Sequence, residues 1–176
     1  MKNKLVPYRY AKSLLKLTYT PESDGERYLD ALAAVRELFG HQQAKSVLQS
    51  PVMPKTVKKQ LLSYALREYE EERPLLERFL FLMVDVGRVS AVSELFGCYQ
   101  ELVDQAKNRR RATIVSAVPL EKKAKEEFVS ALETKMSCKI IAAFKHDAKI
   151  LGGAVVYVGN ELLDMSLKTR LLSVTQ

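Results

Sequence analysis

The sequence predicts an all-α six-helix N-terminal bundle followed by a small α+β C-terminal domain. In the first 108 residues, Pro and Gly fall at a few places that separate segments of helical periodicity. After that point, short runs of β-branched residues surround one charged helical segment. A length of 176 residues fits one large domain or two small ones. The change of pattern at Arg109-Arg110-Arg111 divides the chain into domains 1–108 and 109–176.

The first domain shows the local signals that begin and end helices. Pro7, Pro54 and Pro74 suit first helical turns, where the missing N–H of proline costs no hydrogen bond. Gly40 and Gly87 suit the position just after a helix end. No segment of this domain has the alternation typical of a strand. We expect helices over residues 7–19, 26–39, 42–49, 54–69, 74–87 and 89–108.

The second domain combines strand patterns with one or two helices. We expect strands over residues 112–118, 139–144 and 150–158, a helix over 120–136, and a short final helix over 167–173. Gly159-Asn160 is a two-residue hairpin signal that returns the chain through Leu162 and Leu163. About 65 residues make a small core, so we expect this domain to be stabilised by its neighbour or by a partner.

Charge alone does not select a partner. The chain has 28 Lys and Arg against 21 Asp and Glu, a net charge of +7. Residues 109–176 hold 12 of the basic and 7 of the acidic residues, so most of the excess lies there. This balance permits nucleic acid, an acidic lipid surface or an acidic protein. The basic candidates lack interleaved aromatic residues and have Glu neighbours, which favours a solvated face; they are Arg109, Arg110, Arg111, Lys122, Lys123 and Lys125.

Several classes of protein are excluded by short patterns. The longest apolar run, Phe79 to Val84, is far below the ~20 residues that span a bilayer. The basic start is interrupted by Pro7 and Arg9, so we expect no export signal. Cys98 and Cys138 lack the CxxC spacing of a zinc site, and reduced thiols are favoured over one long-range disulfide.

No catalytic constellation emerges, and we predict no cofactor and no metal site. His146-Asp147 would point to opposite faces of a strand, and His41 has no local acid partner. Gly152-Gly153 lacks the residues of a phosphate loop, which favours a turn or bulge. The consecutive Glu70-Glu71-Glu72 suits a solvated helix start better than an acid and base pair. We therefore predict that the chain is not an enzyme.

The fifth predicted helix is apolar on two sides. Leu76, Leu80, Met83 and Val84 form one face, and a second stripe consists of Leu75, Phe79, Leu82 and Val86. The first helix repeats the feature more weakly, with Ala11, Leu15 and Thr18 inward and Tyr10, Leu14 and Leu17 on an adjoining face. One reading is a central helix that other helices surround. The other is a groove between the first and fifth helices that accepts an amphipathic helix of another chain.

A series of short motifs in the same order resembles the delta subunit family of the F-type ATP synthase, which includes the mitochondrial oligomycin sensitivity-conferring protein. The series is specific because it spans nearly the whole chain, although each motif alone is weak. The matching segments are Tyr10 to Leu15, Leu48 to Val52 with Pro54-Lys55, Phe79-Leu80, Val86 to Val89, Val115 to Leu120, Ile150 to Asn160 and Leu163 to Leu171.

The resemblance implies a non-catalytic stator component that joins the catalytic head to the peripheral stalk during proton-driven ATP synthesis. It implies that the first domain binds the N-terminal helix of an alpha subunit and that the second faces the b subunits of the stalk. It also implies one copy per complex, only indirect membrane contact, and a place at the cytoplasmic face of a bacterial cell membrane. The implied partner-binding residues are Tyr10, Ser13, Leu14, Leu17, Phe79, Leu82 and Val86.

The alternative reading is a basic α+β protein that binds nucleic acid through its second domain. Binding that weakens steeply with salt would support that reading. Absence of RNA or DNA retention at physiological salt would dismiss it.

Overall fold

The chain forms two compact units in the computed structural model. The structure describes residues 5–20, 23–147, 153–158 and 161–166. The first unit covers Met1–Val103 and the second Asp104–Gln176. The first is helical and the second combines a sheet with a helix, so the predicted fold class of a helical part followed by a small α+β part is confirmed.

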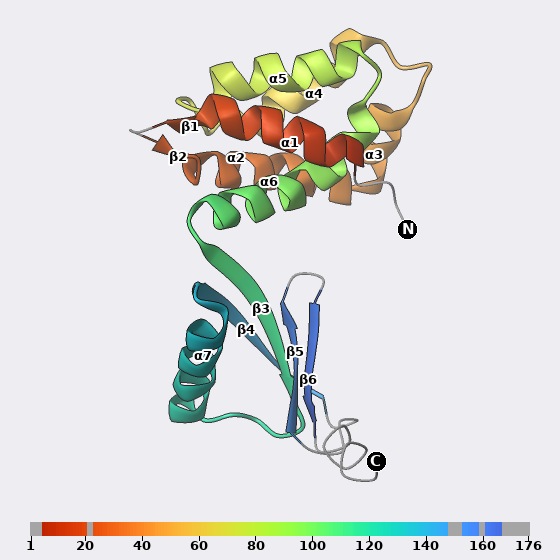
Figure 1. The fold of residues 1–176 in the computed structure, drawn as a ribbon. Helices are drawn as coiled ribbons and strands as arrows, with labels where there is room; N and C mark the ends of the chain where they lie inside the picture. Colours follow the sequence, from red (N-terminus) through yellow and green to blue (C-terminus); the bar gives the residue numbers. More distant parts are fainter. Residues whose placement is uncertain (1–4, 21–22, 148–152, 159–160, 167–176) are drawn as a thin grey trace. The chain divides into compact units, whose positions relative to one another are not determined.

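The helices of the first unit follow the predicted segments closely. Figure 1 shows them gathered into one bundle, and the last of them, α6, begins in this unit. The bounds are α1 (Leu5–Thr18), α2 (Arg27–Gly40), α3 (Gln42–Gln49), α4 (Lys55–Ala65), α5 (Arg73–Asp85), the 3-10 turn η1 (Val89–Ala91) and α6 (Val92–Ala106).

A small hairpin between α1 and α2 contradicts the prediction that the first domain has no strand. Strands β1 (Tyr19–Thr20) and β2 (Ser23–Asp24) pair antiparallel, with Tyr19 opposite Asp24 and Thr20 opposite Ser23. Two residues per strand are too few for an alternating pattern to appear in the sequence. Gly25 follows with φ +75°, a backbone conformation that favours glycine.

Buried hydroxyl groups tie this hairpin to α6. The Thr18 and Tyr99 hydroxyls lie 2.7 Å apart. They also hydrogen-bond to the carbonyl oxygens of Leu14 and Gly25, at 3.0 Å each. A Cβ atom at Gly25 would lie 2.9 Å from the Tyr99 hydroxyl oxygen, so only glycine leaves room for this contact. Leu95, Tyr99 and Val103 are fully buried, so this face of α6 belongs to the core of the unit.

A charged cluster links the start of α2 to the start of α5. Arg27 lies 3.4 Å from a Glu71 oxygen and 3.6 Å from a Glu72 oxygen. It also donates a hydrogen bond to the Tyr28 hydroxyl. The pKa of Arg27 is raised above its ordinary value, first by that hydrogen bond and then by the two nearby carboxylates. Glu71 is therefore an exposed ion-pair partner, as the predicted solvated helix start requires, whereas the Glu72 side chain is only 12% exposed, which differs from that prediction.

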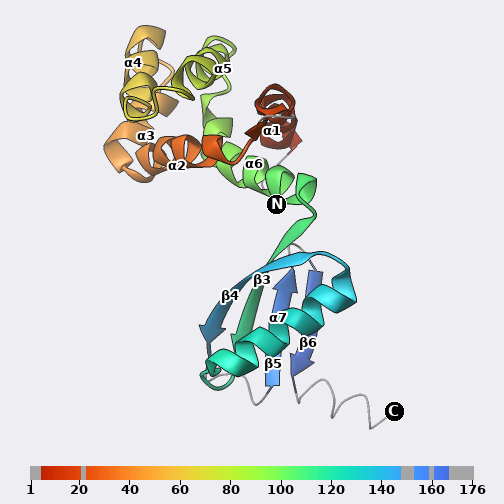
Figure 2. The ribbon, with the colours of Figure 1, turned by 90° about the vertical axis from the view of Figure 1, so that its left-hand side faces the viewer.

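The second unit is a four-stranded sheet with one helix on its face, in the order β4-β3-β5-β6 (Figure 2). Strands β3 and β4 are parallel and are connected through α7, whereas the other neighbours are antiparallel. Val158 pairs with Glu161, as the predicted hairpin requires, and the predicted helix 167–173 lies outside the described residues. The bounds are β3 (Arg109–Ser116), α7 (Lys122–Met136), β4 (Lys139–His146), β5 (Gly153–Val158) and β6 (Glu161–Ser166).

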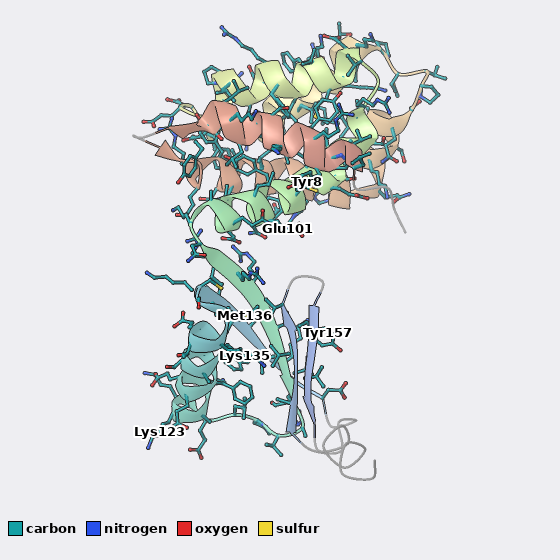
Figure 3. The ribbon with its side chains drawn as sticks, viewed as in Figure 1. Tyr8, Glu101, Lys123, Lys135, Met136 and Tyr157 are labelled. Atoms are coloured by element: carbon teal, nitrogen blue, oxygen red, sulfur yellow. The ribbon has the colours of Figure 1, made fainter. Side chains whose placement is uncertain are left out.

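The sheet buries one face under α7. Ala112, Ile114, Val156 and Val158 are buried there with Leu132 of α7. On the opposite face, Thr113 and Val115 are half-buried, and Tyr157 is exposed and points away from α7 (Figure 3). Ala131 of α7 is exposed. The core of this unit is thus a single thin layer.

The boundary between the units falls five residues before the predicted one, inside α6. Asp104 is buried, and its carboxylate accepts hydrogen bonds from Arg109 at 2.9 Å and Arg111 at 2.6 Å. The last turn of α6 is thereby attached to β3. These bonds also hold Arg109 to Arg111 in a strand, which corrects the prediction that the strand begins at residue 112.

Candidate protein-binding surface

Helices α1 and α5 lie side by side in the first unit (Figures 1 and 2). The rings of Tyr10 and Phe79 meet edge to face between them, with centroids 6.2 Å apart and planes at 82°. Arg88, which follows α5, shares a surface hollow with Val6 of α1. Since Val6 precedes Tyr10 and Arg88 follows Phe79, the two helices run in opposite directions.

The core face of α5 is confirmed. Leu76, Leu80 and Met83 are fully buried, and Val84 is nearly so. On the other stripe, Leu82 is 54% exposed and Val86 is 52% exposed. The reading of α5 as a helix surrounded by its neighbours is therefore wrong for the second half of this stripe, because more than half of each of these two side chains is exposed.

Hydrogen bonds of a helix C-cap fix the backbone on either side of Val86 at the end of α5. Arg88 N–H donates to the Met83 carbonyl at 2.8 Å, and Gly87 N–H donates to the Val84 carbonyl at 3.1 Å. With φ +69° at Gly87, these bonds form a Schellman C-cap, as the sequence predicts for a helix ending there. Lys55 adds a hydrogen bond from its Nζ to the Asp85 carbonyl at 2.9 Å.

The predicted face of α1 needs a correction at one residue. Leu14 is fully buried together with Ala11 and Thr18, whereas Leu15 is half-buried. The inward stripe is therefore Ala11, Leu14 and Thr18, because the Thr18 hydroxyl must reach Tyr99. Leu17 is 59% exposed, as expected for the adjoining face.

The remaining predicted site residues, Tyr10, Ser13 and Phe79, differ in how far their side chains are exposed. Tyr10 is half-buried, and Ser13 is exposed and donates its hydroxyl to the Arg9 carbonyl at 3.0 Å. Phe79 is only 8% exposed, since Tyr10 covers it. We define the α1–α5 surface as Tyr10, Ser13, Leu17, Leu82 and Val86, with Leu14 and Phe79 beneath it. This surface offers exposed leucine and valine side chains over an intact core.

Sequence reasoning assigned no site role to two groups of exposed residues. Val52, Met53 and Val57 lie just before and at the start of α4, Tyr64 lies near its end, and Val52 is 89% exposed. The motif Leu48 to Val52 marked this segment without indicating an interaction. Arg9 and Arg88 were also missed, because isolated arginines carry no sequence signal.

The second unit contains an apolar hollow along α7. Its volume is about 410 Å³. Lys123 lies near the start of α7, and Lys135 and Met136 lie at its end (Figure 3). The hollow is lined by Leu120, Ala124, Glu127, Phe128, Ala131, Leu132 and Lys135. Ala124, Phe128 and Ala131 thus line an opening at the edge of the core.

His146 and the two cysteines were considered from the sequence as candidate functional residues. His146 is exposed, and its Nε2 lies 3.0 Å from the Ala117 carbonyl. Within the described residues, no group of three or more His, Cys, Asp or Glu side chains could hold a metal ion. Cys98 is buried and Cys138 is half-buried, and neither is in a disulfide.

The basic residues of the second unit are partly engaged within the chain. Arg109 and Arg111 both bond to Asp104, and Lys125 lies over the Phe144 ring at 5.5 Å. A basic stripe along β3 is therefore interrupted by an internal counterion. This arrangement gives the nucleic-acid reading no specific support.

Comparison with known proteins gives one consistent family. The family described as "ATP synthase delta (OSCP) subunit" matches residues 6–176. A protein of Solidesulfovibrio magneticus named "ATP synthase subunit delta" is 31% identical, over 97% of this chain and 94% of that protein. A protein of the same name from Syntrophobacter fumaroxidans is 28% identical, over 98% of this chain and 94% of its own length.

A solved structure shares the fold. A chain from the "Cryo-EM structure of Toxoplasma gondii mitochondrial ATP synthase hexamer, composite model" aligns with a TM-score of 0.70. The alignment covers 97% of this chain and 95% of that chain, at 19% identity. At this identity the likeness concerns the fold.

Proposed function

Because the chain belongs to the ATP synthase delta (OSCP) subunit family, we propose that it acts as a non-catalytic stator subunit of an F-type ATP synthase. In this role it links the catalytic head to the peripheral stalk, so that the head resists rotor torque during proton-driven ATP synthesis. One copy serves each complex, and the location is the cytoplasmic face of a bacterial cell membrane. None of the described helices is both long and apolar enough to cross a membrane.

The observation that carries this proposal is the α1–α5 surface. Leu17, Leu82 and Val86 are each more than half exposed, although the core beneath them is complete. Covering a leucine or valine side chain contributes about 1.5–3 kcal/mol. An amphipathic helix laid between two helices buries such side chains at helical spacing. The occupant we propose is the N-terminal helix of an alpha subunit, as the family resemblance implies.

The residues have different roles in this binding mode. Leu17, Leu82 and Val86 contact the docked helix directly, and Tyr10 and Ser13 lie between the two apolar ends. Leu14 and Phe79 lie buried beneath the surface and support the side chains that contact the docked helix. A stator contact that survives rotation requires nanomolar binding, which corresponds to about 12 kcal/mol. A few central anchors usually supply most of such an energy.

We propose that the second unit meets the b subunits of the stalk. The apolar hollow along α7 supports this assignment, since Leu120, Ala124 and Phe128 line an opening that water would otherwise fill. Charged residues at its rim, Glu127 and Lys135, suit a polar border around an apolar contact. Membrane contact is then indirect, through the stalk.

The test is binding of a synthetic alpha-subunit N-terminal helix to the full chain by isothermal titration calorimetry. We expect Leu82→Asp to weaken binding at least about tenfold, since it removes an anchor and places a charge against an apolar face. Val52→Asp is the matched control, because it makes the same kind of change at an exposed aliphatic residue of the same unit. Circular dichroism verifies that both variants are folded, and Leu82→Ala provides a milder step in the same direction.

Equal affinity of the wild type, Leu82→Asp and Leu82→Ala for the peptide would refute the role of this surface. A loss of affinity in Val52→Asp as large as in Leu82→Asp would place the contact elsewhere on the unit.

A further inference from the structure

A hollow at one end of the α1–α5 surface has a chemistry different from the rest of that surface. Its volume is about 360 Å³, and it is lined by Val6, Arg9, Tyr10, Ser13 and Arg88. Arg9 comes from the first half of α1, and Arg88 follows the C-cap of α5. Both arginines are exposed. Two helices that are far apart in the sequence thus bring two guanidinium groups to one opening.

Arg9 and Arg88 differ from the arginines of the same unit that form ion pairs. Arg27 pairs with Glu71 and Glu72, and Arg73 pairs with Glu77 at 2.8 Å. Within the part of the chain that the structure describes, neither the Arg9 nor the Arg88 side chain makes an ion pair, and no carboxylate lines the hollow. Two like charges beside one concavity raise the local positive potential and attract an anion.

We propose that this hollow binds a carboxylate side chain of the helix that occupies the α1–α5 surface. The inference rests on the proposed function and adds what that function leaves open, namely the direction of the docked helix. Guanidinium groups match carboxylates in a planar, often bidentate geometry. Apolar contacts at Leu17, Leu82 and Val86 are compatible with a docked helix in either direction. A positively charged hollow at one end of the surface favours the one direction that places an acidic residue there.

The position of the hollow fixes where the acid must stand. Arg9 and Leu17 are eight residues apart on α1, which is roughly 12 Å along a helix axis. The partner therefore carries an Asp or Glu roughly two helical turns from the apolar side chain that contacts Leu17. Reversal of the helix would place that acid beside Leu17 and leave both arginines without it.

The experiment compares two peptides on the full chain by calorimetry at low and high salt. One is the alpha-subunit N-terminal helix, and the other is the same peptide with its Asp and Glu residues changed to Asn and Gln. We expect the acidic peptide to bind wild type roughly ten- to a hundredfold more tightly at low salt, with a smaller difference at high salt. The double variant Arg9→Gln/Arg88→Gln abolishes the difference, whereas Arg67→Gln, a change at an exposed arginine near α4, preserves it.

Each result separates this inference from the proposed function. Equal and tight binding of both peptides to wild type overturns the carboxylate site and leaves the α1–α5 surface intact. Equal weakening of both peptides in the double variant assigns the arginines a structural role and also overturns it. Failure of both peptides to bind wild type refutes the proposed function itself. Suppression of the difference by millimolar inorganic phosphate, with no effect on the amide peptide, supports an anion site in the hollow.

Discussion

The two units differ in how completely they cover their own apolar residues. The first packs its helices on a core of buried leucine, valine, methionine and aromatic side chains. The second has one helix over one face of a four-stranded sheet, and its core consists mainly of alanine, valine and isoleucine. The first unit therefore exposes apolar residues in addition to a complete core, whereas the second exposes them because its core is thin. This contrast indicates that the first presents a preformed binding surface and that the second gains stability from what it contacts.

The largest expected effects come from making a cavity in each core. Leu80 of α5 and Leu132 of α7 are buried to a similar degree, and truncation of either to alanine costs about 2–5 kcal/mol. We expect Leu80→Ala to leave the first unit folded and Leu132→Ala to unfold the second, because the smaller core has less stability to lose. Amide hydrogen exchange measured by mass spectrometry on the full chain reports each unit separately. Faster exchange throughout the chain in both variants would mean that the two units unfold together. That result would contradict the proposed difference in stability between them.

A smaller effect is expected where the second unit attaches to the end of α6. Asp104→Asn removes the charge that Arg109 and Arg111 share, and weakening these partly buried, charge-assisted hydrogen bonds costs about 1–3 kcal/mol. Chemical denaturation should show this loss in the transition of the second unit. Asp85→Asn is the matched control, since Asp85 is half exposed and its ion pair with Lys59 contributes only about 0–1 kcal/mol. Equal effects of the two changes would show that the Asp104 cluster does not set the boundary.

Local signals predicted most of the helices. Pro74 and Gly87 bracket α5, and the C-cap that Gly87 forms is the structure which that residue favours. The spacing of Leu76, Leu80 and Met83 identified the buried face of α5, because an apolar stripe at helical spacing packs toward the core.

Features that depend on distant contacts were not predictable. Leu14 and Leu15 are adjacent apolar residues, so periodicity alone could not choose between them. Contact of Thr18 with Tyr99, 81 residues away, sets the rotation of α1 and buries Leu14. The start of β3 was missed for the same reason, since three consecutive arginines resemble a loop until Asp104 and the neighbouring strand are known.

The exposure of the candidate site residues was predicted only in part. Leu17, Leu82 and Val86 are exposed as expected, because each lies on the second stripe of its helix. Phe79 belongs to the same stripe and is nevertheless covered, since the Tyr10 ring reaches across from α1. A contact between two helices remote in sequence decides which members of a stripe stay accessible.

The most direct test of the α1–α5 surface is methyl NMR of the full chain during titration with the alpha-subunit N-terminal helix. The account predicts that the methyl signals of Leu17, Leu82 and Val86 shift together and saturate at one equivalent, while those of Val52 and Val118 do not move. Shifts confined to Val52 and its neighbours, with Leu82 and Val86 unchanged, would contradict it.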